Sequence, residues 1–403
     1  MQPSTRPADR YSPLYFLASL GAGGLAVTFF MYLFFWVKHP SQPVPVFEDI
    51  AAAFSAGFLP QQIAIVIAYV GITVFAFLNI KLLIWNITQY RKFRQTKAFE
   101  EFTNSNAETQ LLAMPLSIAM TINVGFILGM VFVPGLWSVV EYLFPMALVA
   151  FGLAGLLAFR LLADFLGRVL TKGGVFDVTA HNSFAQLLPA FALSMVAVGF
   201  AAPAAMSTTP LTVGVGLVGS TFFGVTATIY AVVAAITGFN SMLHYGTAKE
   251  AGPTLLVVVP IMTVLGIMFM RQEHGMHATF GAHSDPIDTL VFLSRMLSVQ
   301  VIFLLLGLLV LRRQGYFRHY LFGSESSPGA YALVCPGVAL SVMTHFWLNK
   351  GLVANGLIAK FSAGYWAITL IAIAFQMSMI WLVFHLNRRH FGRAAQAQGV
   401  PAE

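Results

Sequence analysis

Long apolar stretches alternate with short polar segments along almost the whole chain. A helix needs about 20 mainly apolar residues to cross the hydrocarbon layer of a membrane. By that measure the sequence predicts ten spans, at residues 13–37, 60–87, 113–134, 137–166, 183–206, 211–238, 253–270, 289–311, 329–349 and 363–387. We therefore expect an all-α polytopic membrane protein with a polar segment 1–12, a transmembrane domain 13–387 and a tail 388–403.

The composition agrees with this pattern and excludes a water-soluble protein. Of the 403 residues, 58% are hydrophobic and 9% are charged, whereas an ordinary soluble domain carries about 25% charged residues. The single cysteine, Cys335, excludes an intramolecular disulfide. The net charge of +7 is compatible with nucleic-acid binding, but the charges lie mostly in loops, where insertion topology explains them. We expect membrane lipid as the surroundings and no nucleic-acid partner.

Lysine and arginine are distributed unequally between the two sides of the membrane. Of the 22 such residues, fifteen lie in the N-terminal segment, in the loops after even-numbered spans and in the tail. Three lie inside spans, and the loops after odd-numbered spans hold only Lys38, Arg271, Lys350 and Lys360. Because cytoplasmic loops are enriched in these residues, both termini are predicted to be cytoplasmic. The expected location is the cell membrane, which in a bacterium is the inner membrane.

Each odd-numbered span carries a proline within it or at its beginning. These prolines are Pro13, Pro115, Pro189, Pro260 and Pro336, and their regular spacing predicts five tandem helix hairpins of about 70–75 residues. Proline bends a transmembrane helix and frees a carbonyl group, which is tolerated only beside protein or a water-filled cavity. We therefore expect the kinked odd-numbered helices to line a central pore, although membrane helices in general are rich in proline.

The polar residues of the odd-numbered spans are nearly all neutral. The candidates for lining the pore are Ser19, Thr28, Thr121, Asn123, Ser194, Thr263, Ser341 and Thr344. No Asp, Glu, Lys or Arg lies well inside any of these spans, so the path is expected to bind ions weakly and pass them quickly. Among the charges on even-numbered spans, Arg295 is the best candidate for a structural ion pair or an anion contact, unless it extends to the interface.

Three local sequences, together with the ten spans and five kinked helices, resemble the tellurite-resistance/C4-dicarboxylate transporter family. Residues 253–260 open with Pro-Thr-Leu and end on Pro260, as in the seventh helix of that family. Residues 329–340 are similar to its ninth helix, and residues 183–203, with Leu187-Leu188-Pro189, are similar to its fifth. The chain resembles a divergent member of this family, which also contains the plant slow anion channels.

The resemblance implies a homotrimer in which each protomer has its own pore and passes poorly hydrated anions. In the family, a phenylalanine just before the kink of the ninth helix occludes the pore. Here the matching position is Cys335, preceded by Leu333 and Val334, and these three residues form the predicted gate region. Because the phenylalanine is missing, either another helix supplies the occluding group or the pore is wider.

Three functions follow from these features. The leading hypothesis is passive passage of small anions through a neutral pore, with or without gating. The first alternative is a proton-coupled carrier of a small organic or sulfur-containing acid, for which His345 could accept the proton. The second alternative is a membrane redox protein that uses Cys335 and His345; otherwise Cys335 is a small packing residue.

The sequence contains no motif of an enzyme or a cofactor site. There is no Walker loop, no His-Glu-x-x-His and no Gly-x-Ser-x-Gly, so neither catalysis nor a cofactor is expected. The segment 271–285 contains His274, His277 and His283, but their spacing fits no familiar zinc site. We interpret this segment as a flexible, solvated loop and expect no metal site.

Overall fold

The computed structural model describes residues 10–172, 176–177, 179, 183–283 and 285–391. In this part of the chain all regular structure is helical, and ten helices are long and apolar enough to cross a membrane. The predicted all-α fold is therefore confirmed, and the ten predicted spans correspond to ten helices that are long and apolar enough to cross a membrane. The α-helices are α1 Phe16–Trp36, α2 Phe47–Ala56, α3 Leu59–Phe93, α4 Lys97–Thr103, α5 Ala113–Phe132, α6 Val140–Lys172, α7 Leu188–Met206, α8 Pro210–Tyr245, α9 Val258–Phe280, α10 Pro286–Arg313, α11 Val334–Phe346 and α12 Ala363–Phe391.

The ten long helices fall into a buried set and an exposed set. In the spans that contain α1, α5, α7, α9 and α11, between 56% and 100% of the most apolar stretch is buried. In the spans formed by α3, α6, α8, α10 and α12 the corresponding share is 17–39%. The buried helices are those of the odd-numbered spans, and the exposed apolar faces of the others are suited to contact with lipid.

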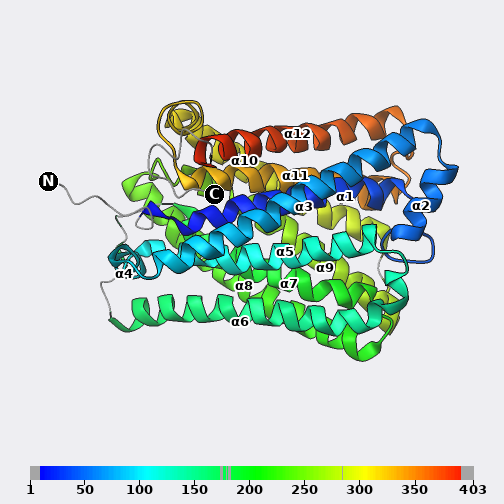
Figure 1. Ribbon diagram of the computed structural model, residues 1–403, viewed down its shortest axis with the longest axis horizontal. Helices are drawn as coiled ribbons and strands as arrows, with labels where there is room; N and C mark the ends of the chain where they lie inside the picture. The colour runs from blue at the N-terminus through cyan, green and yellow to red at the C-terminus, as the bar shows by residue number, and fades with distance from the viewer. Residues whose placement is uncertain (1–9, 173–175, 178, 180–182, 284, 392–403) are drawn as a thin grey trace.

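The five buried helices form a closed ring. Helix α1 contacts α5, α5 contacts α7, α7 contacts α9, α9 contacts α11, and α11 contacts α1. Each exposed helix packs against two neighbours in this ring; α3, for example, contacts α1 and α5. Helix α1 begins and α12 ends at the same end of the bundle, here called the termini end, and α2 lies at the opposite end, here called the α2 end (Figure 1).

Each buried span begins with a short 3-10 segment at the termini end. These segments are η2 Pro13–Tyr15, η3 Asn106–Leu112, η5 Phe184–Leu187, η6 Gly252–Leu256 and η8 Pro328–Leu333. Four of the five prolines lie in the first turn of the α-helix that follows, and Pro13 begins η2. Proline is tolerated there because the first N–H groups of a helix have no partner within it. Four of the prolines therefore mark the change from 3-10 to α-helix near the termini end of their spans, whereas Pro13 marks the start of the 3-10 segment itself.

The 3-10 segments form a second ring, at the termini end of the first. Segment η2 contacts η3 and η8, segment η5 contacts η3 and η6, and segment η6 contacts η8. This second ring closes the bundle on the side from which the five helices start.

Two helices extend further than the sequence predicted. The segment after residue 270 is not a flexible loop, because α9 continues to Phe280. Gly275 makes this possible: a Cβ atom there would lie 2.2 Å from the Ala204 carbonyl oxygen of α7, so only glycine lets the two helices approach so closely. Helix α12 ends at Phe391 instead of residue 387. Most of the predicted segments 1–12 and 388–403 lies outside the described residues.

Candidate functional site: a cavity inside the helix ring

The ring of buried helices encloses a cavity of about 490 Å³. Each helix contributes one stripe of side chains at intervals of three or four residues, which is the spacing of one face of an α-helix. On α7, for example, the stripe is Phe191, Met195, Val198, Ala202 and Ala205. Helix α1 contributes Gly21 and Gly24 among its lining residues, and the absence of side chains there lets Val334 and Val338 of α11 pack against α1.

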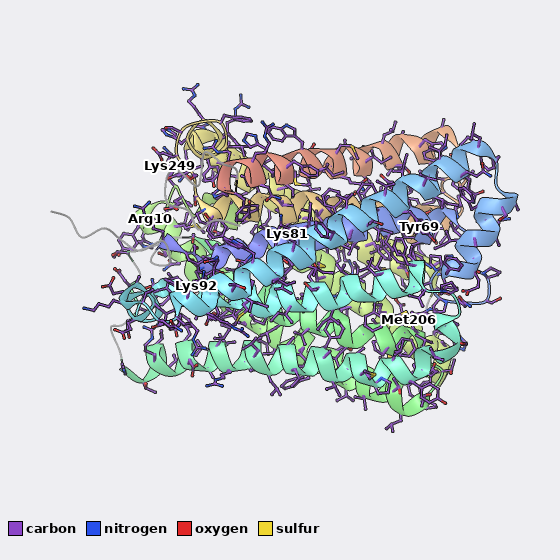
Figure 2. The ribbon with its side chains drawn as sticks, in the orientation of Figure 1. Arg10, Tyr69, Lys81, Lys92, Met206 and Lys249 are labelled. Carbon is purple, nitrogen blue, oxygen red and sulfur yellow. The ribbon has the colours of Figure 1, made fainter. Side chains whose placement is uncertain are left out.

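The cavity opens at the α2 end and is closed toward the termini end. Its lining at the open end includes Met206, His277 and Lys350, and the two latter side chains are exposed. Met206 lies at the opposite end of the bundle from Arg10 (Figure 2). At the closed end the lining residues include the buried Phe191 on α7 and Cys335 on α11.

Beyond the closed end, aromatic side chains of the 3-10 segments η2 and η8 pack against one another and against the outer helix α12. The Tyr15 hydroxyl lies 3.1 Å from Nδ1 of His390, and the Tyr15 and Tyr331 ring centroids are 6.3 Å apart. Both tyrosines are buried. No residue of the 3-10 segments lines the cavity. The described chain is therefore closed between the cavity and the termini end.

The predicted gate region lies at this junction. Leu333 is the last residue of η8, Val334 is the first residue of α11, and Cys335 lines the cavity. Val334 packs against Gly21 of α1, where a Cβ atom would lie 2.8 Å from Cγ1 of Val334. Phe191 of α7 also lines this end and supplies an aromatic ring from another helix.

Only two of the eight polar residues predicted to line a pore face this cavity, namely Asn123 and Thr263. Others connect the inner helices to the outer ones: the Ser19 hydroxyl donates to the Asn79 carbonyl oxygen of α3 at 2.8 Å, and Thr28 accepts a hydrogen bond from Nε2 of Gln376 of α12 at 2.9 Å. The residues that do not line the cavity are Ser19, Thr28, Thr121, Ser194, Ser341 and Thr344.

Arg271 lines the cavity and is the residue that the sequence reasoning missed. Its NH1 group donates to the Val198 carbonyl oxygen at 3.0 Å. Among the described residues no carboxylate forms an ion pair with it, although Glu273 also lines the cavity. The interval of four residues from Thr263 to Ile267 and from Ile267 to Arg271 is the signal that could have found it. Arg271 is thus a half-buried cation without a counter-ion, facing a cavity.

More positive charges gather around the open end. Lys350, in the π-helical segment η9 Trp347–Val353 that continues α11, lines the cavity. Burial and the nearby ammonium groups of Lys38 and Lys350 lower the pKa of Lys360 below its usual value. The four lysines and arginines that the sequence assigns to the loops after odd-numbered spans thus lie at or near one opening.

Arg295 lies outside the cavity. It is exposed on α10 and borders a shallow surface groove with Ser294 and Trp347, whose Nε1 donates to the Ser294 hydroxyl at 2.9 Å. Within the described residues it forms no ion pair. This position gives Arg295 no contact with a ligand in the cavity.

The structure does not bring Cys335 and His345 to a common site. Cys335 lines the cavity, whereas His345 does not. The His345 side chain is 1% exposed, its two ring nitrogens have no hydrogen-bond partner, and the rings of Tyr32, Phe35 and Trp36 lie around it. No group of three His, Cys, Asp or Glu side chains in the described part of the chain is arranged to hold a metal ion.

Comparison with known proteins adds no relative. No protein-family model matches the chain, and no curated protein or solved structure matches it either. The resemblance to the tellurite-resistance/C4-dicarboxylate transporter family therefore stays a prediction. The geometry itself defines a membrane protein with a central, one-ended cavity whose opening is positively charged.

Proposed function

We propose that this protein passes small anions across a membrane through the cavity enclosed by its five inner helices. The observation that carries this proposal is Arg271, which faces the cavity without a carboxylate partner. A buried charge without a partner is destabilising, and such charges are normally paired. An anion in the cavity would provide the missing partner.

The charges around the opening support the same conclusion. Lys350 lines the opening, and Lys38 and Lys360 lie close enough to interact electrostatically. A concave, low-dielectric surface with one sign of charge raises the local concentration of the opposite ion. Glu273 is the only carboxylate among the lining residues, so the cations outnumber it.

The rest of the cavity wall supports passage in preference to tight capture. Between the opening and the closed end the lining side chains are uncharged. Conduction requires binding that is strong enough to admit an ion and weak enough to release it. A charged opening followed by a neutral wall meets both conditions. Passage then requires the closed end, where Phe191 and Cys335 lie, to open.

A second candidate, a proton-coupled carrier of an organic or sulfur-containing acid, is favoured by His345. Its two ring nitrogens are buried without a partner, which is unusual because buried polar groups are normally hydrogen-bonded. A histidine in such a position can take up a proton when the conformation changes. Because His345 lies behind the cavity wall, coupling of this kind would act through α11.

We further propose that the protein assembles as a trimer with one path in each protomer. The resemblance noted above implies this assembly, and a cavity lined entirely by one chain is consistent with a separate path in each copy. Native mass spectrometry of the purified protein would show trimers; a monomer at all concentrations would contradict this part of the proposal.

Anion flux in proteoliposomes tests the function. Chloride, nitrate, sulfite and malate are compared under an imposed voltage and then under a proton gradient. Voltage-driven flux of monovalent anions that is independent of the proton gradient would support the passive path. Flux that appears only with a proton gradient would support the carrier instead. The absence of flux under both conditions would contradict anion transport.

A further inference from the structure

The chemistry of the cavity wall differs from that of its opening. Six methionines and five phenylalanines line it, and the charged residues are confined to the α2 end. A volume of about 490 Å³ is within the range of sites that bind organic molecules, about 300–1,000 Å³. The cavity is therefore much larger than a small inorganic ion requires.

The inner part of the cavity offers few donors to a small anion. Its polar side chains are Asn123, Thr263 and Cys335. Asn123 Nδ2 already donates to the Ala119 carbonyl oxygen at 3.0 Å, and the Thr263 hydroxyl donates to the Ala339 carbonyl oxygen at 3.1 Å. A bare inorganic anion would lose its water here without gaining equivalent hydrogen bonds, which is costly.

An apolar group meets a suitable wall in the same place. Methionine is flexible and polarizable, so a methionine-rich surface adapts to apolar bodies of different shapes. Phe126 and Met130 on α5 and Phe191 and Met195 on α7 are among these lining residues. Aliphatic and aromatic groups would gain from burial against them, by an amount that grows with the apolar area removed from water.

The opening supplies what a charged head group needs. A guanidinium group has five N–H donors, and Arg271 has one in use, toward the Val198 carbonyl oxygen. The remaining donors suit a carboxylate or a sulfonate, which arginine binds through two parallel hydrogen bonds. Lys350, in the segment η9 that continues the neighbouring helix α11, adds a second positive charge.

We propose that the cavity binds organic monoanions with an apolar body, such as alkyl or aryl carboxylates and sulfonates. Arg271 holds the head group near the opening, and the body lies along the methionine and phenylalanine side chains. This inference rests on the proposed anion function, for which it names the substrate class. It also assigns specificity to two different regions: Arg271 selects the charge, and the wall selects the apolar body.

A series of linear alkanesulfonates with one to eight carbons tests this assignment, because sulfonates stay ionised at every working pH. Binding is measured by equilibrium dialysis against the protein in nanodiscs, with empty nanodiscs as the blank. Affinity is expected to rise by up to about fourfold for each methylene group, the factor for full burial of one CH₂. An affinity that does not depend on chain length after subtraction of the blank would overturn the assignment of the wall.

Variants separate the head group from the body. Arg271→Gln is expected to weaken every sulfonate by about tenfold or more, the loss of one charged hydrogen bond, while the dependence on chain length stays. Met195→Ser is expected to reduce the dependence on chain length while preserving the preference for a sulfonate over the alcohol of equal length. Arg295→Gln is the matched control and should leave both properties unchanged. If Arg271→Gln folds poorly, Arg271→Lys, which retains the charge, should keep the preference for anions.

Comparison with the flux assay distinguishes the two proposals. If chloride and nitrate cross the membrane but longer sulfonates bind no better than methanesulfonate, the substrate class is wrong and the anion function stands. If longer sulfonates bind with the expected chain-length dependence but no anion crosses, the substrate class stands and the transport function is wrong. Equal binding of alkanesulfonates and the corresponding alcohols would overturn the role of Arg271.

Discussion

Two half-buried arginines lie at opposite ends of the molecule, Arg168 at the closed end and Arg271 at the open end, and they differ in their partners. Arg168, on α6, pairs through Nε and NH2 with the Glu108 carboxylate, and its NH2 group also donates to the Ser105 carbonyl oxygen at 3.2 Å. Arg271, on α9, has a single backbone carbonyl group as its partner and faces the cavity. The first charge has a counter-ion within the chain, and among the described residues the second has none.

This difference indicates that Arg168 and Arg271 have different roles. A paired, buried arginine contributes to the structure, because removing one partner leaves the other charge uncompensated. An unpaired arginine at a cavity destabilises the empty protein and is useful only when an anion is present. Substitution of Arg168 should therefore lower stability and leave anion flux unchanged. Substitution of Arg271 should lower anion flux without lowering stability.

The largest effect is expected for Arg168→Gln. Glu108 would lose its cation while its side chain is 9% exposed, so the free energy of unfolding should fall by about 3 kcal/mol. Thermal unfolding in detergent measures this change. Anion flux per folded protein should stay the same, and Arg160→Gln, an exposed arginine on the same helix, is the control. A normal melting temperature would show that Arg168 is not structural.

Arg271→Gln should show the opposite profile. Flux is expected to fall by about tenfold, equivalent to the loss of one charged hydrogen bond to the anion. Thermal stability should stay equal or rise, because an unpaired charge is removed. Arg295→Gln, outside the cavity on the next helix, should change flux little. A loss of stability without a loss of flux in Arg271→Gln would remove the distinction between the two arginines.

Cys335→Phe should reduce flux several-fold. The larger ring would fill the closed end of the cavity beside Phe191 and restore the aromatic group that the family resemblance places there. Cys335→Ser, which keeps the volume, should change flux much less. Equal flux in the phenylalanine variant and the unmodified protein, measured in the same proteoliposomes, would place the narrowest point of the path elsewhere.

The smallest effect concerns pH. Burial and the charges of Lys38 and Lys350 lower the pKa of Lys360, so this side chain loses its proton at a lower pH than an ordinary lysine. As pH rises through that lowered pKa, the opening loses a positive charge, and flux should decline by about twofold at most because solvent and salt screen the charge. Lys360→Arg should abolish this decline in flux.

The same lowered pKa fixes the sign of the stability change. The charged form of Lys360 is disfavoured in the folded protein, so the free energy of unfolding should increase as pH rises from the lowered pKa toward the usual value. Lys360→Gln should remove this increase, as measured by thermal unfolding between neutral and alkaline pH. An unchanged pH profile in the variant would assign the effect to other groups.

The sequence predicted the number of spans and singled out the helices that the structure buries. Apolar length decides whether a segment spans a membrane. Prolines also lie at the start of α3, α8 and α10 and inside α6, so it is the regular spacing of Pro115, Pro189, Pro260 and Pro336 that singled out the buried spans. These are local properties of the chain, so they can be read without tertiary information.

The rotation of each inner helix could not be predicted. These helices are apolar on all sides, so no amphipathic stripe indicates which side chains face the cavity. Ser19 and Thr28 are polar but bond to outer helices, whereas the apolar Phe191 lines the cavity. Arg271 was assigned to a loop because the apolar run ends at residue 270, although the helix continues to Phe280.

The most direct test of the account uses Cys335, the only cysteine in the chain, as a reporter of the cavity. Two membrane-impermeant methanethiosulfonates of similar size, one with a sulfonate and one with an ammonium group, are added to either side of reconstituted protein. The account predicts that the sulfonate reagent reacts with Cys335 faster than the ammonium reagent and that it reacts from the α2 side alone. Its attachment should block anion flux. In Arg271→Gln the two reagents should react at similar rates. Faster reaction of the ammonium reagent, or complete labelling with undiminished flux, would contradict an anion path through this cavity.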